Sequence, residues 1–191
     1  MKSKSPAEDP SRKRSMHRSR AYPAITLESA LEKCRSLYQS ERMHPTPIAA
    51  AVQAMGYANN ASGASTRTIA ALGHYGLVDF EGTRKDRIAQ VTELGRDIVI
   101  HPFPDSMEVK EMLQEATLNP PICRELWEKY HGDLPSDVSL AHQLEQSGDL
   151  NPNAIKQFLS VFRDNISFSG LGHTNRTTPN AEPGVSDGDR S

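Results

Sequence analysis

The sequence predicts a mainly helical α+β chain made of two tandem units, and three observations support this. Apolar residues recur at helical spacing through most of residues 22–171, and Gly, Pro and capping residues divide that stretch into short segments. Two short runs with strand-like alternation follow each other in residues 77–91. The order of elements in residues 22–101 (the first unit) is repeated in residues 102–171 (the second unit) with little sequence similarity.

The first unit is predicted to begin with two helices. Thr26 is a good N-cap for a helix with one apolar face. The run Pro45-Thr46-Pro47 ends one element and starts another, with Thr46 as the N-cap and Pro47 at the first helical position. Gly56 ends this second, short helix.

The third predicted helix, from Ser62 to about Tyr75, has two different sides. One side repeats large apolar residues and is predicted to face the core, whereas the other side carries small or polar residues. The core side is predicted to hold Ile69, Leu72 and Tyr75, and the opposite side Ala64, Arg67, Ala71 and His74.

A β-hairpin and a further helix are predicted in residues 76–99. Residues 77–80 alternate apolar and polar side chains, residues 81–87 form a polar turn that contains Gly, and residues 88–91 form the second strand. Thr92 is predicted to cap the helix that follows.

The second unit is predicted to hold four helices. Asp105 or Ser106 opens the first of them, and Asn119-Pro120-Pro121 breaks it. The second ends at Gly132, the third is capped at Pro135-Ser136-Asp137, and the fourth begins at Asn151-Pro152. Residues 166–168 are predicted to form a terminal strand, so the unit reads as a helix-turn-helix with a reduced hairpin.

The run GLVDFEGTRKDRIAQVTELGRDIV at residues 76–99 resembles the winged helix-turn-helix family, whose members often read Gly-Leu-Val, a charged wing, an apolar strand and Thr-x-x-Gly-Arg. The whole chain is similar to bacterial proteins built of tandem winged-helix-like domains. This resemblance implies a DNA-binding fold, with the third helix in the major groove and the wing on phosphate or the minor groove. Arg67 is the residue expected to reach a guanine edge. The implied DNA-binding residues are Ser65, Thr66, Arg67 and Thr68 in the helix and Arg84, Lys85 and Arg87 in the wing.

Charge is distributed unevenly along the chain. Residues 1–20 carry a net charge of +5, residues 21–101 are balanced, residues 102–171 carry −6 and residues 172–191 carry −1. A polyanion would therefore meet the basic arm and the first unit more favourably than the second unit. The arm residues predicted to lie along DNA phosphates are Arg12, Lys13 and Arg14.

Alternative interpretations of these cations stay open. The wing can be a solvated hairpin whose charges keep its edge from pairing with other chains. The arm can be a solubilising tail or a nuclear address. Residues 1–21 and 172–191 are polar, without periodicity, and are predicted to be disordered.

Several classes of protein are not indicated. No apolar run approaches the roughly 18 residues of a membrane span, and no secretory signal is recognised, so a cytoplasmic location is predicted. Cys34 and Cys123 stand among apolar neighbours and are predicted to be buried thiols rather than ligands or a disulfide. No catalytic motif, metal-ligand spacing or cofactor-binding loop is found in the sequence.

The sequence thus favours a non-enzymatic protein that binds double-stranded DNA through the first unit, in transcriptional regulation or DNA architecture, and near the nucleoid if it is bacterial. Residues 102–171 would serve self-association as a homodimer, or binding of a protein partner. The alternative is a protein–protein interaction adaptor that uses winged helices only as scaffolds.

Overall fold

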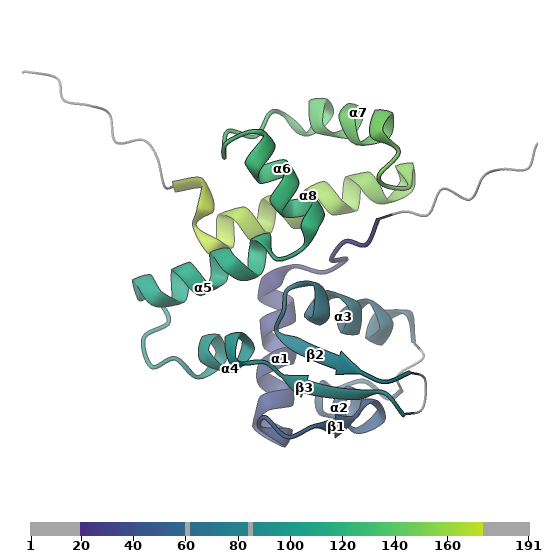
Figure 1. Cartoon of the computed structure of the whole chain (residues 1–191), viewed down its shortest axis with the longest axis vertical. Coiled ribbons are helices and arrows are strands. Elements are labelled where there is room, and N and C mark those ends of the chain that lie inside the picture. Colours follow the sequence, from purple (N-terminus) through teal and green to yellow (C-terminus); the bar gives the residue numbers. More distant parts are fainter. Residues whose placement is uncertain (1–19, 60–61, 84–85, 174–191) are drawn as a thin grey trace, which may run out of the picture.

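The structure is a computed structural model that describes residues 20–59, 62–83 and 86–173. The described chain is mainly helical, with a small three-stranded antiparallel sheet (Figure 1), which confirms the predicted α+β class. In chain order the elements are α1 (Leu27–Glu41), β1 (Thr46–Pro47), α2 (Ile48–Ala54), α3 (Gly63–His74), β2 (Val78–Glu81), β3 (Ile88–Val91), α4 (Glu93–Ile100), α5 (Met107–Leu118), α6 (Pro121–Lys129), α7 (Asp137–Ser147), α8 (Pro152–Ser169) and the 3₁₀ turn η2 (Leu171–His173).

Side-chain caps fix the start of six helices, as the sequence predicts. In each case an oxygen of the cap residue accepts a hydrogen bond from a backbone N–H in the first turn. Of the two starts considered for α5, Ser106 is the cap. The six cap residues are Thr26, Ser62, Thr92, Ser106, Ser136 and Asn151.

The predicted start of the second helix is wrong by one residue, since α2 begins at Ile48 and not at Pro47. Thr46 and Pro47 form the short strand β1, in which they pair with Ala89 and Ile88 of β3. The Thr46 hydroxyl donates to the carbonyl oxygen of His44 instead of capping a helix. β1 therefore adds a third strand to the predicted hairpin, and the strand order is β1-β3-β2.

The predicted terminal strand at residues 166–168 is also wrong. These residues belong to α8, which continues to Ser169 and ends at Gly170 in the left-handed conformation. Ile166 lies four residues after Phe162, so it extends the buried face of the helix. Residues 102–171, all of which are described, contain helices and no strand, and so the second unit has no hairpin.

Two hydrophobic clusters fill the molecule. The first cluster includes buried residues from α1 to α4 and from the sheet, and the second joins α6, α7 and α8. Val109, Leu113 and Ala116 of α5 belong to the first cluster, although the sequence places α5 in the second unit. Figure 1 accordingly shows α5 between α4 of the first unit and α8 of the second.

A buried polar network joins the two units. Asn165 of α8 is fully buried; its Oδ1 accepts from the Leu27 N–H at 2.7 Å, and its Nδ2 donates to the Tyr75 hydroxyl at 2.8 Å. The Tyr75 hydroxyl donates in turn to the Ile25 carbonyl at 2.7 Å, and Nδ2 of Asn119 donates to the Tyr75 carbonyl at 3.0 Å. The C-terminal end of α3 is therefore hydrogen-bonded to residues of the second unit.

Candidate nucleic-acid interface

The exposed side of α3 carries mostly small side chains. Apart from Thr66 and Arg67, its exposed residues are Gly63, Ala64, Ala70 and Gly73. The guanidinium of Arg67 lies over the first turn, since its Nη1 is 3.9 Å from where a Cβ on Gly63 would stand. Arg67 forms no ion pair within the described part of the chain. It is thus an exposed cation on a helix face that a partner can approach closely.

Two of the predicted DNA-binding residues face inward instead. Ser65 is fully buried, and its hydroxyl donates to the Ser62 carbonyl at 3.0 Å. Thr68 is 2% exposed, and its hydroxyl is hydrogen-bonded to the Tyr57 hydroxyl at 2.7 Å. Both hydroxyls therefore hold the start of α3 and the loop before it, and neither reaches an external ligand.

The inner side of α3 is wider than the sequence predicts. Ala71, expected on the outer side, is fully buried, and His74 is partly buried. The reason is that α3 packs both against α1 and against β2, so that more than one face of the helix is covered. Burial lowers the pKa of His74 below its ordinary value.

The hairpin places one of its predicted residues next to α3. Arg87 is partly buried, and its guanidinium carbon lies 4.6 Å from the centroid of the Phe80 ring. Phe80 in turn contacts the exposed side of α3 near Gly73. The other two predicted hairpin residues, Arg84 and Lys85, lie outside the described residues.

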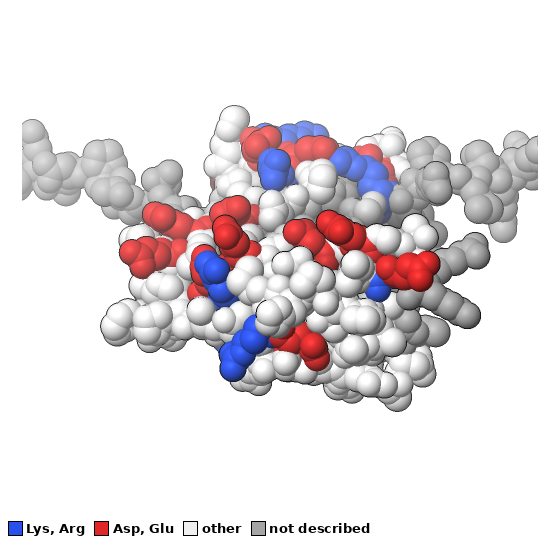
Figure 2. Space-filling model, turned by 60° about the horizontal axis from the view of Figure 1, so that its bottom comes forward, with Lys and Arg blue, Asp and Glu red and all other residues white. Residues whose placement is uncertain are grey.

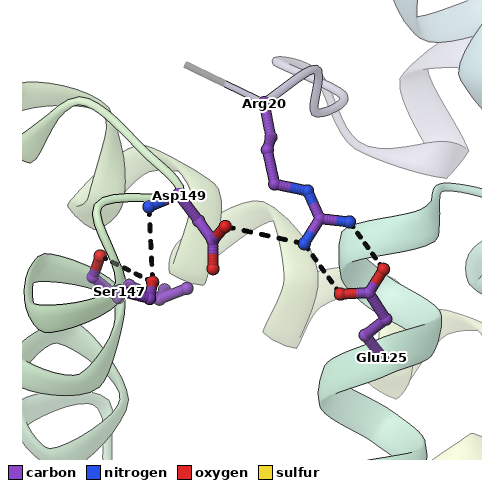
Figure 3. A network of polar contacts seen from close by, with 5 residues as sticks. Arg20, Glu125, Ser147 and Asp149 are labelled. Atoms are coloured by element: carbon purple, nitrogen blue, oxygen red, sulfur yellow. Dashed lines mark hydrogen bonds and ion pairs between the residues drawn. The ribbon is translucent and has the colours of Figure 1, made fainter. Parts of the chain in front are cut away.

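The N-terminal segment is attached to the second unit. Arg12, Lys13 and Arg14 lie outside the described residues, but Arg20, which the sequence analysis placed in a disordered arm, has a defined position. Its guanidinium donates two hydrogen bonds to the Glu125 carboxylate at 2.6 and 2.7 Å (Figure 3).

Asp149 is a second acidic residue in contact with Arg20. Asp149 lies 3.7 Å from the Arg20 guanidinium, and its carbonyl oxygen accepts from the Arg20 N–H at 2.8 Å (Figure 3 shows the side chains). The hydrogen bonds from Arg20 lower the pKa of Glu125. After Arg20, the Tyr22 ring packs edge-on against Phe158. The contact of Arg20 with Glu125 and Asp149 is hard to predict from the sequence, because the charge pattern groups Arg20 with the basic residues of the arm.

The surface charge is mixed. On the face in Figure 2, acidic side chains form several groups across the molecule and basic side chains lie among them. This agrees with a balanced first unit and with the net charge of −6 on the second unit. The face shown in Figure 2 therefore presents no broad basic surface to a polyanion, and attraction by the first unit depends on individual cations.

The described His, Cys, Asp and Glu residues form no metal site, and both cysteines are buried. No group of three or more His, Cys, Asp or Glu residues is placed to hold a metal ion in the described part of the chain. Burial raises the pKa of Cys34 and of Cys123 to about 12, so both thiols are protonated at neutral pH. Their prediction as buried thiols is confirmed.

A polar cleft of about 340 Å³ lies between the start of α1 and the end of α8. Its lining includes the carboxylates of Glu28 and Asp164 but no Lys, Arg or His. The buried side chain of Asn165 in its wall is already hydrogen-bonded to the Leu27 N–H and the Tyr75 hydroxyl, so it is not an unpaired polar group facing the cleft. It is therefore not a site for an anionic ligand.

Among the described residues, no helix has both the length and the apolar character needed to cross a membrane. In comparisons with known proteins, the chain matches no protein-family model, no curated protein and no solved structure.

Proposed function

We propose that the first unit is a winged helix-turn-helix that binds double-stranded DNA, with α3 in the major groove and the β2–β3 hairpin beside it. The observation that carries the proposal is the placement of Arg67 on the exposed side of α3 together with Arg87 on the adjoining hairpin. The order helix, strand, helix, helix, hairpin supports it, as does the pairing of β1 with the inner strand β3.

The side chains of α3 suit a close approach to DNA. A major groove about 12 Å wide admits a helix about 10–12 Å across, and small exposed residues reduce the bulk that has to enter. Arg67 can donate two parallel hydrogen bonds to a guanine edge, and the exposed Thr66 can reach a phosphate oxygen. One long cation on the helix provides little sequence discrimination, so a dimer on two half-sites is the form we expect to bind specifically.

We assign the second unit to self-association or to a protein partner. Three large apolar side chains are exposed at the α4–α5 corner, where the first unit ends and the second begins: Ile100 is 51% exposed, Phe103 71% and Met107 70%. Exposed apolar groups of this size favour a protein contact, whereas the net charge of −6 on residues 102–171 disfavours contact with DNA. Transcriptional regulation or DNA architecture is the role we propose for the whole chain.

The test is fluorescence anisotropy with duplex DNA of mixed sequence at about 50 mM salt. Arg67→Ala is expected to weaken binding by about 5- to 150-fold, which corresponds to the loss of about 1–3 kcal/mol. Arg124→Ala in α6 is the matched control, because it removes one cation from the acidic second unit, and it should leave the affinity nearly unchanged. An unchanged affinity of Arg67→Ala would contradict the role of α3.

The second candidate is a protein–protein interaction adaptor. The exposed corner of Ile100, Phe103 and Met107 favours it, together with the balanced charge of the first unit. Absence of DNA binding by the full chain at low salt, combined with binding to a protein partner that Phe103→Glu abolishes, would select this candidate.

A further inference from the structure

The register of the hairpin places Arg87 and Phe80 on the same side of the sheet. Phe80 is directly opposite Ala89 of β3, and Arg87 lies two residues before Ala89, immediately before the first residue of that strand. Residues in this diagonal relation share a face, and an aromatic or long side chain can bridge the distance. The guanidinium carbon of Arg87 is accordingly 4.6 Å from the centroid of the Phe80 ring, which is within the range of a cation–π contact.

Phe80 rests in turn on α3. A Cβ at Gly73 would stand 3.4 Å from the nearest atom of the Phe80 ring, so the ring lies beside the last turn of the helix. Gly73 itself adds no side chain between the ring and the helix backbone. Gly73, Phe80 and Arg87 thus form a stack, here called the Arg87 stack, that connects the hairpin to the exposed side of α3.

The backbone of Arg87 is fixed by a hydrogen bond, in addition to the ring contact of its guanidinium. Its carbonyl oxygen accepts a hydrogen bond from the Ile48 N–H at 2.9 Å, which ties it to the start of α2. On the other side, the turn closes at Gly82, whose φ is +75° and whose missing Cβ would lie 2.5 Å from the Asp86 carbonyl oxygen. Only glycine fits at position 82 without displacing the backbone beside Asp86, the residue before Arg87.

The stacked guanidinium retains its hydrogen-bonding capacity. Contact with the ring uses one face of the planar group and leaves its N–H donors in the plane available to an anion. Within the described residues, Arg87 forms no ion pair with a carboxylate. A planar, fixed cation with unpaired N–H donors matches the two oxygens of a phosphodiester.

On this basis we propose that Phe80 is a positioning residue, which holds Arg87 against a backbone phosphate of the DNA that α3 binds. The inference rests on the proposed function, and it assigns a ligand class to one cation: Arg87 contacts phosphate and reads no base. Because the guanidinium is ordered before binding, little conformational entropy is lost when the contact forms.

Salt-dependent DNA binding of variants of the full chain tests this assignment. Arg87→Gln is expected to weaken binding about three- to tenfold at 50 mM salt, and to reduce the slope of log affinity against log salt by about 1, equally for two unrelated duplex sequences. Phe80→Leu removes the ring and should reproduce part of both effects, whereas Phe80→Tyr keeps the ring and should restore wild-type values. Arg124→Gln is the charge-matched control and should change neither quantity.

An NMR measurement without DNA tests whether the Arg87 stack forms, separately from its role in binding DNA. The side-chain CH₂ protons of Arg87 should be shifted by the ring current in the wild type and in Phe80→Tyr, but not in Phe80→Leu. If Phe80→Leu is unfolded, Phe80→Met takes its place in both measurements, because it also removes the ring but fills the space with a flexible apolar side chain.

The outcomes are distinguishable. If the wild type binds no DNA, the proposed function fails and this inference fails with it. If the wild type binds DNA but Arg87→Gln has an unchanged salt slope, or affects one duplex far more than another, the phosphate assignment is overturned while the proposed function stands. If Phe80→Leu loses the ring-current shift but binds like the wild type, Phe80 has no positioning role.

Discussion

Replacing Asn165 by alanine tests how strongly the two units are joined. Asn165 is fully buried, and its side chain satisfies the N–H of Leu27 and contacts the hydroxyl of Tyr75. In Asn165→Ala the Leu27 N–H, which begins α1 and has no partner within that helix, loses its acceptor.

The magnitude follows from these contacts. An unsatisfied buried N–H costs about 1–3 kcal/mol, and losing the hydrogen bond to Tyr75 adds about 1 kcal/mol. Tyr75 keeps a partner in the Ile25 carbonyl, so its own loss is limited. We therefore expect Asn165→Ala to lower the free energy of unfolding by about 2–4 kcal/mol, a large part of the stability of a domain of this size.

The assay is urea unfolding, followed by circular dichroism and by Trp127 fluorescence. With a slope of about 2 kcal/mol per molar urea, the midpoint should fall by about 1–2 M, and both probes should give the same transition. Asn153→Ala, at an exposed position of the same helix, is the matched control and should change stability by less than about 0.5 kcal/mol. A shift in Asn165→Ala as small as the control's, or one confined to a single probe, would refute the argument that the network joins the units.

Three other predictions concern packing, pH and the thiols. Gly95→Ala should destabilise the protein by at least about 2 kcal/mol in thermal or urea unfolding, because the new Cβ would lie 2.3 Å from a backbone carbonyl oxygen. Gly73→Ala, which meets only an aromatic ring at 3.4 Å, should change stability by less than about 1 kcal/mol. Burial lowers the pKa of His74, so the stability that its neutral form contributes is complete above the ordinary histidine pKa and is lost as the pH falls through the lower pKa of the folded state. Urea unfolding of His74→Gln should therefore be less pH-dependent between about pH 7 and pH 5 than that of the wild type. Because burial raises the pKa of Cys34 and Cys123 to about 12, an aromatic disulfide reagent at pH 7.5 should label neither thiol in the native state and both after unfolding; rapid labelling of the native protein would contradict their burial.

Local signals in the sequence predict much of the first unit. A cap such as Ser62 or Thr92 acts within three residues of its own position, so the helix starts can be read directly. The alternation at residues 77–80 and 88–91 predicts β2 and β3 for the same reason. In both cases the decisive interaction is close in sequence.

The errors occur where distant residues decide the structure. The local sequence around Thr46 favours a helix cap, yet pairing with Ala89 makes it a strand residue. Residues 166–168 look like a strand by composition, but the apolar face of α8 continues through Ile166. Local propensity is overridden in both places by packing that the sequence alone does not display.

The candidate site was predictable only in part. Arg67 is exposed on α3 as expected, but Ser65 and Thr68 are buried because α3 packs on more than one side. The role of Phe80 was not recognised, since a half-buried aromatic residue in a strand normally signals only core packing. Its contact with Arg87 depends on the strand register, which a single sequence does not fix.

The most direct test of DNA binding by the first unit compares the full chain with residues 20–191 in anisotropy titrations of mixed-sequence duplex DNA at two salt concentrations. Starting at residue 20 removes the basic arm while retaining Arg20 and its contacts with the second unit. We expect both proteins to bind DNA, with affinities that fall steeply as salt increases. Binding by the full chain alone would assign DNA contact to the arm and contradict DNA binding by the first unit.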